Sequence, residues 1–331
     1  MVVVLYSGGL DSTFVAFLLK KLNVGFYCVY IKVCLTTSTV WFSEYCKCEL
    51  LAATLCCSLL FVDLSKYYCS YVFSRFRYCY ARGLTPNPDI FCNSKLKFSC
   101  FVNYCLQYFG VPVYYFSGHY ACKRTQSLAI ARDWVKDQTY FLCAVFCFCN
   151  LFFLLGNFFK YEVRFFIIFL CLLACVNATS RGVCFLGINN FASFVARYCT
   201  RRYIIYNTIG KFLGYARAGY LTVGQRFTYC GLKDTYVVRK CPVTITVAKR
   251  NSNRTLTYHV SVLLRSLLGT IVFPKVYYCK VNSCSWFFKC FVWCVSLPYF
   301  VHFVYPVRVL AKGQFLVIYD AGLIIAGMEI I

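Results

Sequence analysis

A strand, a glycine turn and a helix are predicted within the first 22 residues of the chain. The apolar run Val2–Tyr6 leads into the sequence Ser7-Gly-Gly-Leu-Asp-Ser12, and the apolar-periodic segment Phe14–Leu22 follows. A glycine pair at this place lets the backbone approach a phosphate group, which the N–H groups and the dipole of the helix then attract. The sequence therefore predicts a phosphate-binding loop at Ser7–Ser12.

This loop differs from the phosphate-binding loop of many nucleotide hydrolases. The pattern G-x-x-x-x-G-K-[ST], whose lysine grips the γ-phosphate, does not occur anywhere in the chain. Asp11 is instead placed to hold the Mg²⁺ that accompanies a nucleotide. A plain strand-to-helix turn is the alternative interpretation of these residues taken alone.

Apolar runs typical of strands alternate with helix-like segments over the next hundred residues. The alternation predicts a parallel sheet covered by helices. The expected strands are Gly25–Lys32, Leu59–Leu64 and Val113–Ser117, and the expected helices are Leu50–Ser58, Tyr67–Arg82 and Ser94–Phe109. Beyond about residue 200, short β-prone runs predict small β domains. These runs are Tyr220–Val223, Tyr236–Val238 and Val243–Ala248.

The predicted fold class is therefore α/β. We expect a doubly wound parallel-sheet domain that carries the phosphate-binding loop at 1–196, a small central β domain at 197–250 and a C-terminal β-barrel-like domain at 251–331. A chain of 331 residues has room for two or three such domains.

Charge and hydropathy favour different partners. The chain has 35 Lys and Arg against 11 Asp and Glu, and its net charge of +24 favours a polyanion such as nucleic acid. Its 60% of hydrophobic residues is more typical of a membrane protein. The most apolar stretch, Thr139–Phe159, could span a bilayer at about 20 residues, but Asn150 and Asn157 interrupt it. The next stretch, Phe165–Val176, suits a buried helix. We expect no membrane partner, and an integral membrane protein is kept as an alternative.

The cysteines favour a reducing compartment. There are 25 of them in a long chain whose N-terminus, MVVVLYSGG, lacks the basic region and cleavage site of a signal peptide. No C-x-x-C pair occurs, and only 3 histidines are present, so the usual zinc and iron–sulfur spacings are missing. We expect a cytoplasmic protein without zinc or an iron–sulfur cluster, in which most thiols fill the core.

Two cysteines and a proline-rich segment are candidates for chemistry. Two prolines flank Asn87 in Thr85-Pro-Asn-Pro-Asp89, which predicts a rigid exposed loop able to read a flipped base. Cys92 comes just before a helix expected near Ser94, where the helix dipole and a nearby lysine favour the thiolate. Cys184 follows an arginine and a glycine that favour the thiolate and close approach.

The loop Ser7–Ser12 and the strand before it resemble the pyrophosphate-loop ATPases, which have an adenine nucleotide alpha hydrolase-like fold. The later motifs, in their order, resemble the tRNA-specific 2-thiouridylase family over essentially the whole chain. They are Thr85–Asp89 with Cys92-Asn93 and Lys95–Phe98, Ser117–Tyr120, Lys136–Leu142, Lys160–Arg164, Gly182–Gly187 and Thr222–Arg226.

The resemblance implies a two-stage reaction on the wobble uridine of tRNA. ATP with Mg²⁺ adenylates the 2-carbonyl oxygen, and sulfur from a persulfide on Cys184 then displaces AMP to give 2-thiouridine. Cys92 is the nucleophile that forms a transient disulfide with Cys184, and Asp89 is the candidate general acid or base. The implied partners are tRNA, a sulfur-carrier protein and a cysteine desulfurase.

The resemblance also implies the binding residues. ATP is expected to contact Leu5, Tyr6, Ser7, Gly8, Gly9, Leu10, Asp11, Ser12, Ile31 and Gly118. The target base is expected to contact Asn87, Pro88 and Asp89, and the tRNA to contact His119, Lys136, Asp137, Gln138 and Gln314.

Two segments depart from the family pattern. Ser180-Arg181 stands where the family has Asp-Ser, and Asn282-Ser283 stands where it has Arg-Tyr. These changes concern peripheral contacts to tRNA more than the chemistry. The alternatives are another pyrophosphate-loop adenylating enzyme, of the amidating synthetase type, which needs no reactive cysteine pair, and a tRNA-binding protein without catalysis.

Overall fold

The expected parallel sheet is present in the computed structural model of the chain. The model describes residues 1–33, 40–125, 127–146, 149–172, 194–195, 200–217, 219–229, 232–250, 252–294 and 297–331. The chain divides into two units. The first comprises Met1–Val72, Asp89–Gly187 and Ala321–Ile324, and the second comprises Phe73–Pro88, Ile188–Asp320 and Ile325–Ile331.

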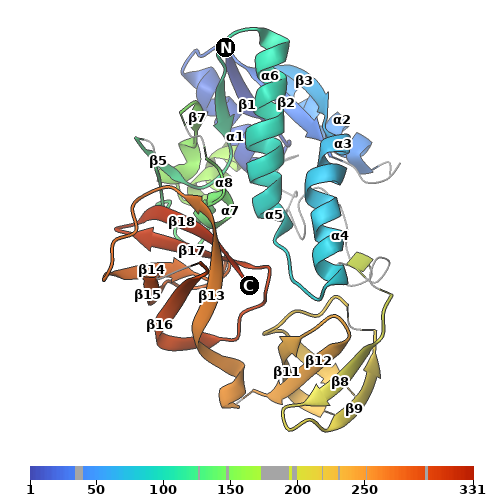
Figure 1. Cartoon of the computed structure of the whole chain (residues 1–331). Coiled ribbons are helices and arrows are strands. Elements are labelled where there is room, and N and C mark those ends of the chain that lie inside the picture. Colours follow the sequence, from blue (N-terminus) through green and yellow to red (C-terminus); the bar gives the residue numbers. More distant parts are fainter. Residues whose placement is uncertain are drawn as a thin grey trace. The chain divides into compact units, whose positions relative to one another are not determined.

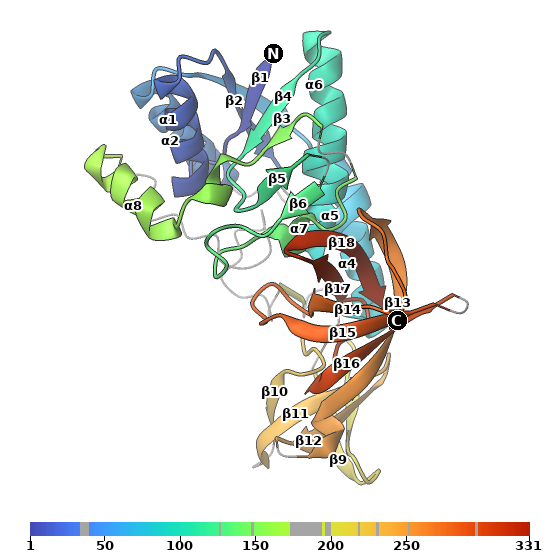
Figure 2. The same cartoon turned by 90° about the vertical axis from the view of Figure 1, so that its left-hand side faces the viewer.

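A five-stranded sheet in the order β3-β2-β1-β4-β7 forms the centre of the first unit (Figure 1). Every neighbouring pair in this sheet is parallel. The strands are β1 (Val2–Leu5), β2 (Tyr27–Lys32), β3 (Ser58–Asp63), β4 (Tyr114–Ser117) and β7 (Leu151–Phe152). Helices α1 (Leu10–Lys21) and α2 (Val40–Thr54) cover one face, and α6 (Phe101–Phe109) covers the other (Figure 2). This is the doubly wound arrangement.

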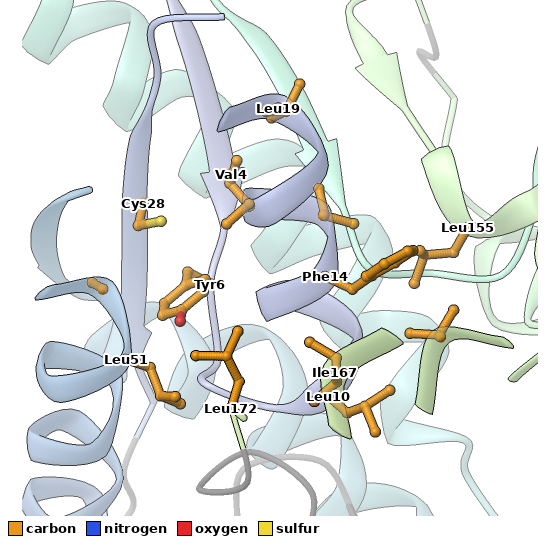
Figure 3. Packing of buried hydrophobic residues seen from close by; sticks show 14 of the residues in the cluster. Val4, Tyr6, Leu10, Phe14, Leu19, Cys28, Leu51, Leu155, Ile167 and Leu172 are labelled. Atoms are coloured by element: carbon orange, nitrogen blue, oxygen red, sulfur yellow. The ribbon is translucent and has the colours of Figure 1, made fainter. Parts of the chain in front are cut away.

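The core of the first unit lies between β1 and the helices on one face of the sheet. Figure 3 shows Val4 and Tyr6 beside Phe14 and Leu19 of α1, with Leu51 of α2 on one side. Helix α8 (Lys160–Phe169) adds Val163 and Ile167 to the same cluster. Because each of these side chains is buried, the apolar periodicity of α1 fixes how the helix lies on the sheet.

The remaining elements of the first unit are short. They are α3 (Ser65–Tyr68), the wider π-helical segments η1 (Cys69–Phe73), which runs into the second unit, and η2 (Cys92–Cys100), then α5 (Pro88–Phe91), α7 (Thr139–Leu142) and η3 (Leu154–Asn157). Strands β5 (Cys122–Arg124) and β6 (Ser127–Ala129) pair as a hairpin, and Ala129 pairs with Leu323 at the start of β18 (Leu323–Ile330).

The described part of the second unit includes helix α4 (Ser74–Ala81) and two β sheets. The first sheet has the order β10-β11-β12-β8-β9, with β8 (Tyr203–Asn207), β9 (Phe212–Ala216), β10 (Arg226–Tyr229), β11 (Leu232–Lys240) and β12 (Thr244–Lys249). A short 3₁₀ turn, η5 (Asn253–Thr255), follows. In the second sheet β13 pairs with both β16 and β18, which closes it into a barrel. Besides β18, this barrel contains β13 (Leu256–Leu267), β14 (Val276–Lys280), β15 (Phe288–Trp293), β16 (Tyr299–Arg308) and β17 (Phe315–Asp320).

The predicted fold class is confirmed: a doubly wound parallel sheet is followed by two β-rich regions, one of them a barrel. The boundaries of the three predicted domains stay a prediction.

Several predictions of individual helices and strands were wrong. Helix α1 begins at Leu10, four residues before the predicted start at Phe14, because Gly9 serves as its N-cap. Helix α2 begins at Val40, whereas the predicted helix began at Leu50. Tyr220–Val223 is not a strand, since Gly224 with a φ of +85° turns the chain there.

The apolar stretches do not form membrane-spanning helices. In the described part of the chain, no helix is both long and apolar enough to cross a bilayer. Thr139–Phe159 is divided among α7, β7 and η3. The expectation of a buried helix in Phe165–Val176 was wrong: α8 ends at Phe169, and Phe165 and Phe169 are 66% and 75% exposed. Only one face of α8 is buried, through Val163 and Ile167.

Replacing Gly156 by alanine is expected to destabilise the first unit by about 3 kcal/mol, because an added methyl group overpacks a rigid site. A Cβ atom on Gly156 in η3 would lie 2.1 Å from the carbonyl oxygen of Ala121, which is backbone and cannot rotate away. The matched control is Gly25→Ala, because no atom lies within 4 Å of a Cβ there. Urea denaturation measures both, and equal midpoints for the two variants would contradict the packing argument.

Candidate functional site

The strand order of the first unit places a topological switch point at the carboxyl ends of β1 and β4, where a ligand crevice is expected. The chain leaves β1 toward β2 on one side, and β4 adds on the other side, so the connections diverge at this point. In sheets of this type ligands bind at such a switch point. The structure brings two predicted segments together here: the loop Ser7–Ser12 after β1 and Gly118 after β4.

The loop after β1 is folded around Ser12. The hydroxyl of Ser12 accepts a hydrogen bond from the backbone N–H of Ser7 at 3.2 Å and donates one to the carbonyl of Gly9 at 3.2 Å. Gly8 has a φ of +63°, and a Cβ on it would lie 2.8 Å from the sulfur of Cys48. Gly9 is the N-cap of α1 and offers no side chain to the first turn. The N–H groups of that turn therefore lack a side-chain cap among the described residues and can receive an anion.

Gly118 lets the two segments come close. A Cβ on Gly118 would lie 3.0 Å from the backbone nitrogen of Ser12 and 3.1 Å from the Cβ of Asp11. Both neighbours belong to the first turn of α1, which cannot shift without moving the helix. A glycine at this place therefore allows the segment after β4 to lie directly against the first turn of α1.

Asp11 is the centre of the polar contacts at the crevice. The ammonium group of Lys160 donates to both carboxylate oxygens of Asp11, at 2.5 and 2.6 Å, and the hydroxyl of Tyr120 donates to Oδ1 at 2.9 Å. The Lys160 ammonium also lies 5.4 Å from the centre of the Tyr120 ring. Burial, followed by the charge of Asp11, raises the pKa of Tyr120, so this hydroxyl stays a hydrogen-bond donor. The first turn of α1 is thereby joined to α8 and to the segment after β4.

A second set of hydrogen bonds continues from Tyr120 to α7. Two hydrogen bonds join Tyr120 and Gln138. The N–H of Tyr120 donates to Oε1 of Gln138 at 2.9 Å, and the N–H of Gln138 donates to the carbonyl of Tyr120 at 2.8 Å. The buried carboxylate of Asp137 accepts from the N–H of Ala131 and from the hydroxyl of Thr139. Asp137 and Gln138 thus hold the start of α7. Their predicted contacts to tRNA, and that of the exposed Lys136, stay predictions.

Cys92 is buried within a helical run. The expectation that a helix begins near Ser94 was wrong, because α5 begins at Pro88 and continues directly into η2. Proline is suited to the first helical position, since its φ is preset and it has no N–H to satisfy. Cys92 is 2% exposed, and Asp89 lies three residues earlier, on the same side of the run.

Asn93 connects this run to α7. Its Nδ2 donates to the carbonyl of Phe141 at 3.2 Å, while its buried Oδ1 has no hydrogen-bond partner among the described residues. An acceptor left unsatisfied beside a candidate nucleophile marks a place for a ligand donor. Through Asn93, α7 and Gln138, the Cys92 segment is linked to the crevice within one unit. The second cysteine of the predicted pair, Cys184, lies outside the described residues.

His119 is a neutral imidazole between β4 and η2. Its Nδ1 lies 2.6 Å from the hydroxyl of Ser117, and its ring packs against Phe98 and Phe153 with centroid distances of 5.9 and 6.4 Å. Burial, and then the charge of Lys97, lowers the pKa of His119 from 6.5 to about 3. Its predicted contact to tRNA would therefore be that of an uncharged ring.

Two segments that were predicted to contact RNA, the loop with Asn87 and Pro88 and the segment with Gln314, lie side by side in the second unit. The N–H of Thr85 donates to the carbonyl of Lys312 at 2.8 Å. Gly313 has a φ of +88°, and a Cβ on it would lie 3.1 Å from the carbonyl oxygen of Thr85. The loop that carries Asn87 and Pro88 is therefore packed beside the segment that carries Gln314. The expectation of an exposed loop was wrong, because Thr85 is 6% exposed and the residues from Asn87 to Asp89 are only partly exposed.

The other predicted ATP contacts belong largely to the core. Tyr6, Leu10 and Ile31 are at most 7% exposed, and Leu5 ends β1. Any contact of these residues with a ligand would be made by their backbone or by the edge of the side chain. Beside Ile31, Lys32 forms an ion pair with Asp63 at 2.9 Å.

Asp11 fits a magnesium ion only as a single carboxylate. Mg²⁺ in nucleotide sites commonly takes one or two carboxylates and completes its shell with phosphates and water. The Asp11 side chain is 32% exposed, so the ion could reach it, although Lys160 and Tyr120 already use its oxygens. Among the described residues, no group of three or more His, Cys, Asp or Glu side chains could hold a metal ion.

Three contributors to the site had no role assigned from the sequence. Lys160 and Tyr120 lie in two of the motifs that resemble the family, Lys160–Arg164 and Ser117–Tyr120, but their positions in the sequence do not indicate a contact with Asp11. Asp133 was missed altogether: its carboxylate accepts from the backbone N–H groups of Lys136 and Lys160. The available signal was the scarcity of acidic residues, 11 in the whole chain, which makes each of them a candidate for a specific contact.

Comparisons with known proteins agree along the length of the chain. A family model described as "tRNA methyl transferase HUP domain" matches residues 1–188. A protein named "tRNA-specific 2-thiouridylase MnmA" from Legionella pneumophila (strain Lens) is 30% identical over 366 residues, covering 99% of this chain and 98% of that protein. A protein of the same name from Chlamydia trachomatis serovar L2 is 31% identical over 355 residues, covering 98% and 96%. One from Onion yellows phytoplasma is 34% identical over 253 residues, covering 68% and 66%.

The low pKa of His119 predicts a loss of stability in acid. Because the folded pKa lies below the unfolded value, the unfolded chain binds the extra proton first. The contribution of His119 to stability is therefore complete above about pH 6.5 and is lost as the pH falls toward 3, at up to about 1.4 kcal/mol per pH unit. Denaturation midpoints of the wild type and His119→Gln between pH 7 and 4 test this, and parallel curves would refute it. In NMR titration the His119 ring should not titrate between pH 5 and 8.

Proposed function

This chain belongs to the tRNA-specific 2-thiouridylase family, and on that premise we propose that it is an ATP-dependent tRNA sulfurtransferase. It replaces the 2-oxygen of the wobble uridine with sulfur. The observation that carries the proposal is the linkage, within one unit, of an anion-binding helix N-terminus at Gly9 with the segment of Cys92. Adenylation and sulfur transfer require an ATP site and a nucleophilic cysteine that act on the same atom of the base.

The first step in this proposal activates the uridine. Its 2-carbonyl oxygen attacks the α-phosphorus of ATP, the bond to pyrophosphate breaks, and the oxygen becomes part of an AMP leaving group. The N–H groups of the first turn of α1, including that of Ser12, and the hydroxyl of Ser7 bind the phosphates. Because Gly8 and Gly118 carry no side chains, the backbone can approach the nucleotide. When Mg²⁺ accompanies ATP, Asp11 would supply its carboxylate ligand, and the charge of the ion would offset that of the phosphates.

The second step replaces AMP by sulfur. The terminal sulfur of a persulfide on Cys184 attacks C2 of the base, and the bond from C2 to the adenylated oxygen breaks. Cys92 then attacks the inner sulfur of the persulfide, so that a Cys92–Cys184 disulfide forms and the outer sulfur stays on the base. In a variant of this step, Cys92 forms the disulfide first and releases sulfide, which attacks C2. The two cysteines lose two electrons, and a reducing thiol must restore them. In this proposal Asp89, three residues before Cys92, is the general acid or base that moves the proton.

Sulfur and substrate come from outside the chain. A sulfur-carrier protein that draws on a cysteine desulfurase supplies the persulfide, and the described cysteines are free thiols, as a reducing cytoplasm requires. The net charge of +24 favours tRNA as the substrate through contacts to its phosphates. Asn87, Pro88 and Asp89 are the residues proposed for the target base. His119, Lys136, Asp137, Gln138 and Gln314 are those proposed for the rest of the tRNA.

Replacement of either cysteine is expected to abolish thiolation. The protein is incubated with tRNA, ATP, Mg²⁺ and a persulfide source, and mass spectrometry of the nucleosides measures 2-thiouridine. Cys92→Ser and Cys184→Ala should each lower the product at least about 100-fold, because each removes a bond-forming sulfur. Cys100→Ser, in the same helical segment η2, is the matched control and should keep activity.

The outcomes separate this proposal from its competitors. Full activity of Cys92→Ser would favour an adenylating enzyme that needs no cysteine pair. Binding of tRNA by the wild type without any consumption of ATP would favour a tRNA-binding protein without catalysis.

A further inference from the structure

The phosphate-binding loop has its cationic partner on a different element of the fold. Ser7–Ser12 contains no lysine or arginine, and it includes an acid, Asp11, in the first turn of α1. A carboxylate there benefits from the helix dipole but repels a phosphate that binds the same turn. Lys160, which is 149 residues away in sequence, supplies the missing positive charge. Its ammonium group lies within hydrogen-bond distance of both oxygens of Asp11.

The backbone of Lys160 is fixed while its ammonium group is accessible. Its N–H donates to the carboxylate of Asp133 at 2.9 Å. The preceding N–H, of Phe159, donates to Glu162 at 2.7 Å, which caps the start of α8. The side chains of Lys160 and Asp11 are 34% and 32% exposed, so their pair faces solvent at the crevice. The flexible stem of a lysine lets its charge move by a few ångströms from such an anchored Cα atom.

We infer that Lys160 is a phosphate-binding residue of the nucleotide site, held by Asp11 in the free protein and transferred to the nucleotide phosphates on binding. This inference rests on the proposed function, because it takes ATP to be the ligand of the crevice. The exchange replaces one anionic partner of Lys160 by another of higher charge. It also frees an oxygen of Asp11 for the Mg²⁺ that arrives with the nucleotide, while Tyr120 continues to orient the carboxylate.

Two roles for Lys160 have to be separated. If its only role is to neutralise Asp11, removing Lys160 has no effect on nucleotide affinity once Asp11 has lost its charge. If Lys160 binds phosphate, its removal weakens binding even in a protein that has no charge at position 11. The decisive comparison is therefore between Asp11→Asn and the double variant Asp11→Asn with Lys160→Met.

The experiment measures the affinity of the full-length chain for α,β-methylene ATP by calorimetry in the presence of EDTA. Without Mg²⁺, Asp11 only repels the ligand and retains Lys160. Asp11→Asn should therefore bind about 10-fold more tightly than the wild type. Lys160→Met should bind about 10–100-fold more weakly than the wild type, and the double variant should be weaker than Asp11→Asn by a similar factor. Lys160→Arg should recover part of the loss.

The controls exclude an effect on folding. Adenosine has no phosphate and should bind equally to all variants, whereas a distorted site would lose adenosine as well. Lys20→Met removes an exposed lysine at the other end of α1, which contacts the carbonyl of Cys56, and should bind α,β-methylene ATP like the wild type.

The possible failures are distinguishable. Equal affinity of Asp11→Asn and the double variant, or a parallel loss of adenosine binding, would overturn the role of Lys160 alone. A wild type that binds no adenine nucleotide would overturn both this inference and the proposed function. A wild type that shows the predicted pattern of affinities but never thiolates tRNA would overturn the proposed function and leave the role of Lys160 standing.

Discussion

The carboxylate of Asp11 joins three parts of the first unit that the chain itself keeps far apart. It lies in the first turn of α1 and accepts hydrogen bonds from Lys160 of α8 and from Tyr120 after β4. An ion pair that is about one-third exposed adds little to stability, because solvent screens it and both side chains lose freedom. Its value is geometric: it fixes where one positive and one negative charge lie at the carboxyl ends of β1 and β4. Tyr120 and Gln138 extend the same network to α7, and α7 contacts the segment of Cys92.

Backbone packing gives this polar network its precision. At Gly118 the first turn of α1 lies so close that no side chain would fit. At Gly8 the sulfur of Cys48 occupies the space that a side chain would need. The nearest atoms at Gly118 are backbone, which a change of rotamer cannot move, so the segment after β4 is held firmly against the first turn of α1. A polar site that must orient a phosphate needs such rigidity more than it needs additional binding groups.

The sequence predicted the parts of the fold that are local. Strand β1, the glycine turn and α1 follow one another within 21 residues, and their apolar spacing and glycines determine them. The start of the Cys92 helix was misplaced because the two prolines were interpreted as a rigid loop, whereas Pro88 serves as the first helical residue. The half-exposed α8 was expected to be buried because high apolar content conceals which face packs. The Asp11–Lys160 pair could not be predicted from spacing at all, since 149 residues and several elements separate its members.

The scarcity of acids in this chain connects its stability with its choice of partner. The described carboxylates are largely committed to contacts inside the protein. Glu329 is 6% exposed and binds both Arg75 and Arg265, and the carboxylate of Asp133 accepts two backbone N–H groups. The 35 basic residues outnumber the 11 acidic ones, which leaves the chain with a net charge of +24. The mutual repulsion of the basic residues destabilises the folded chain, and a polyanion relieves it. The same imbalance that weakens the free protein therefore favours its binding to RNA, most strongly at low ionic strength, where exposed charges are least screened.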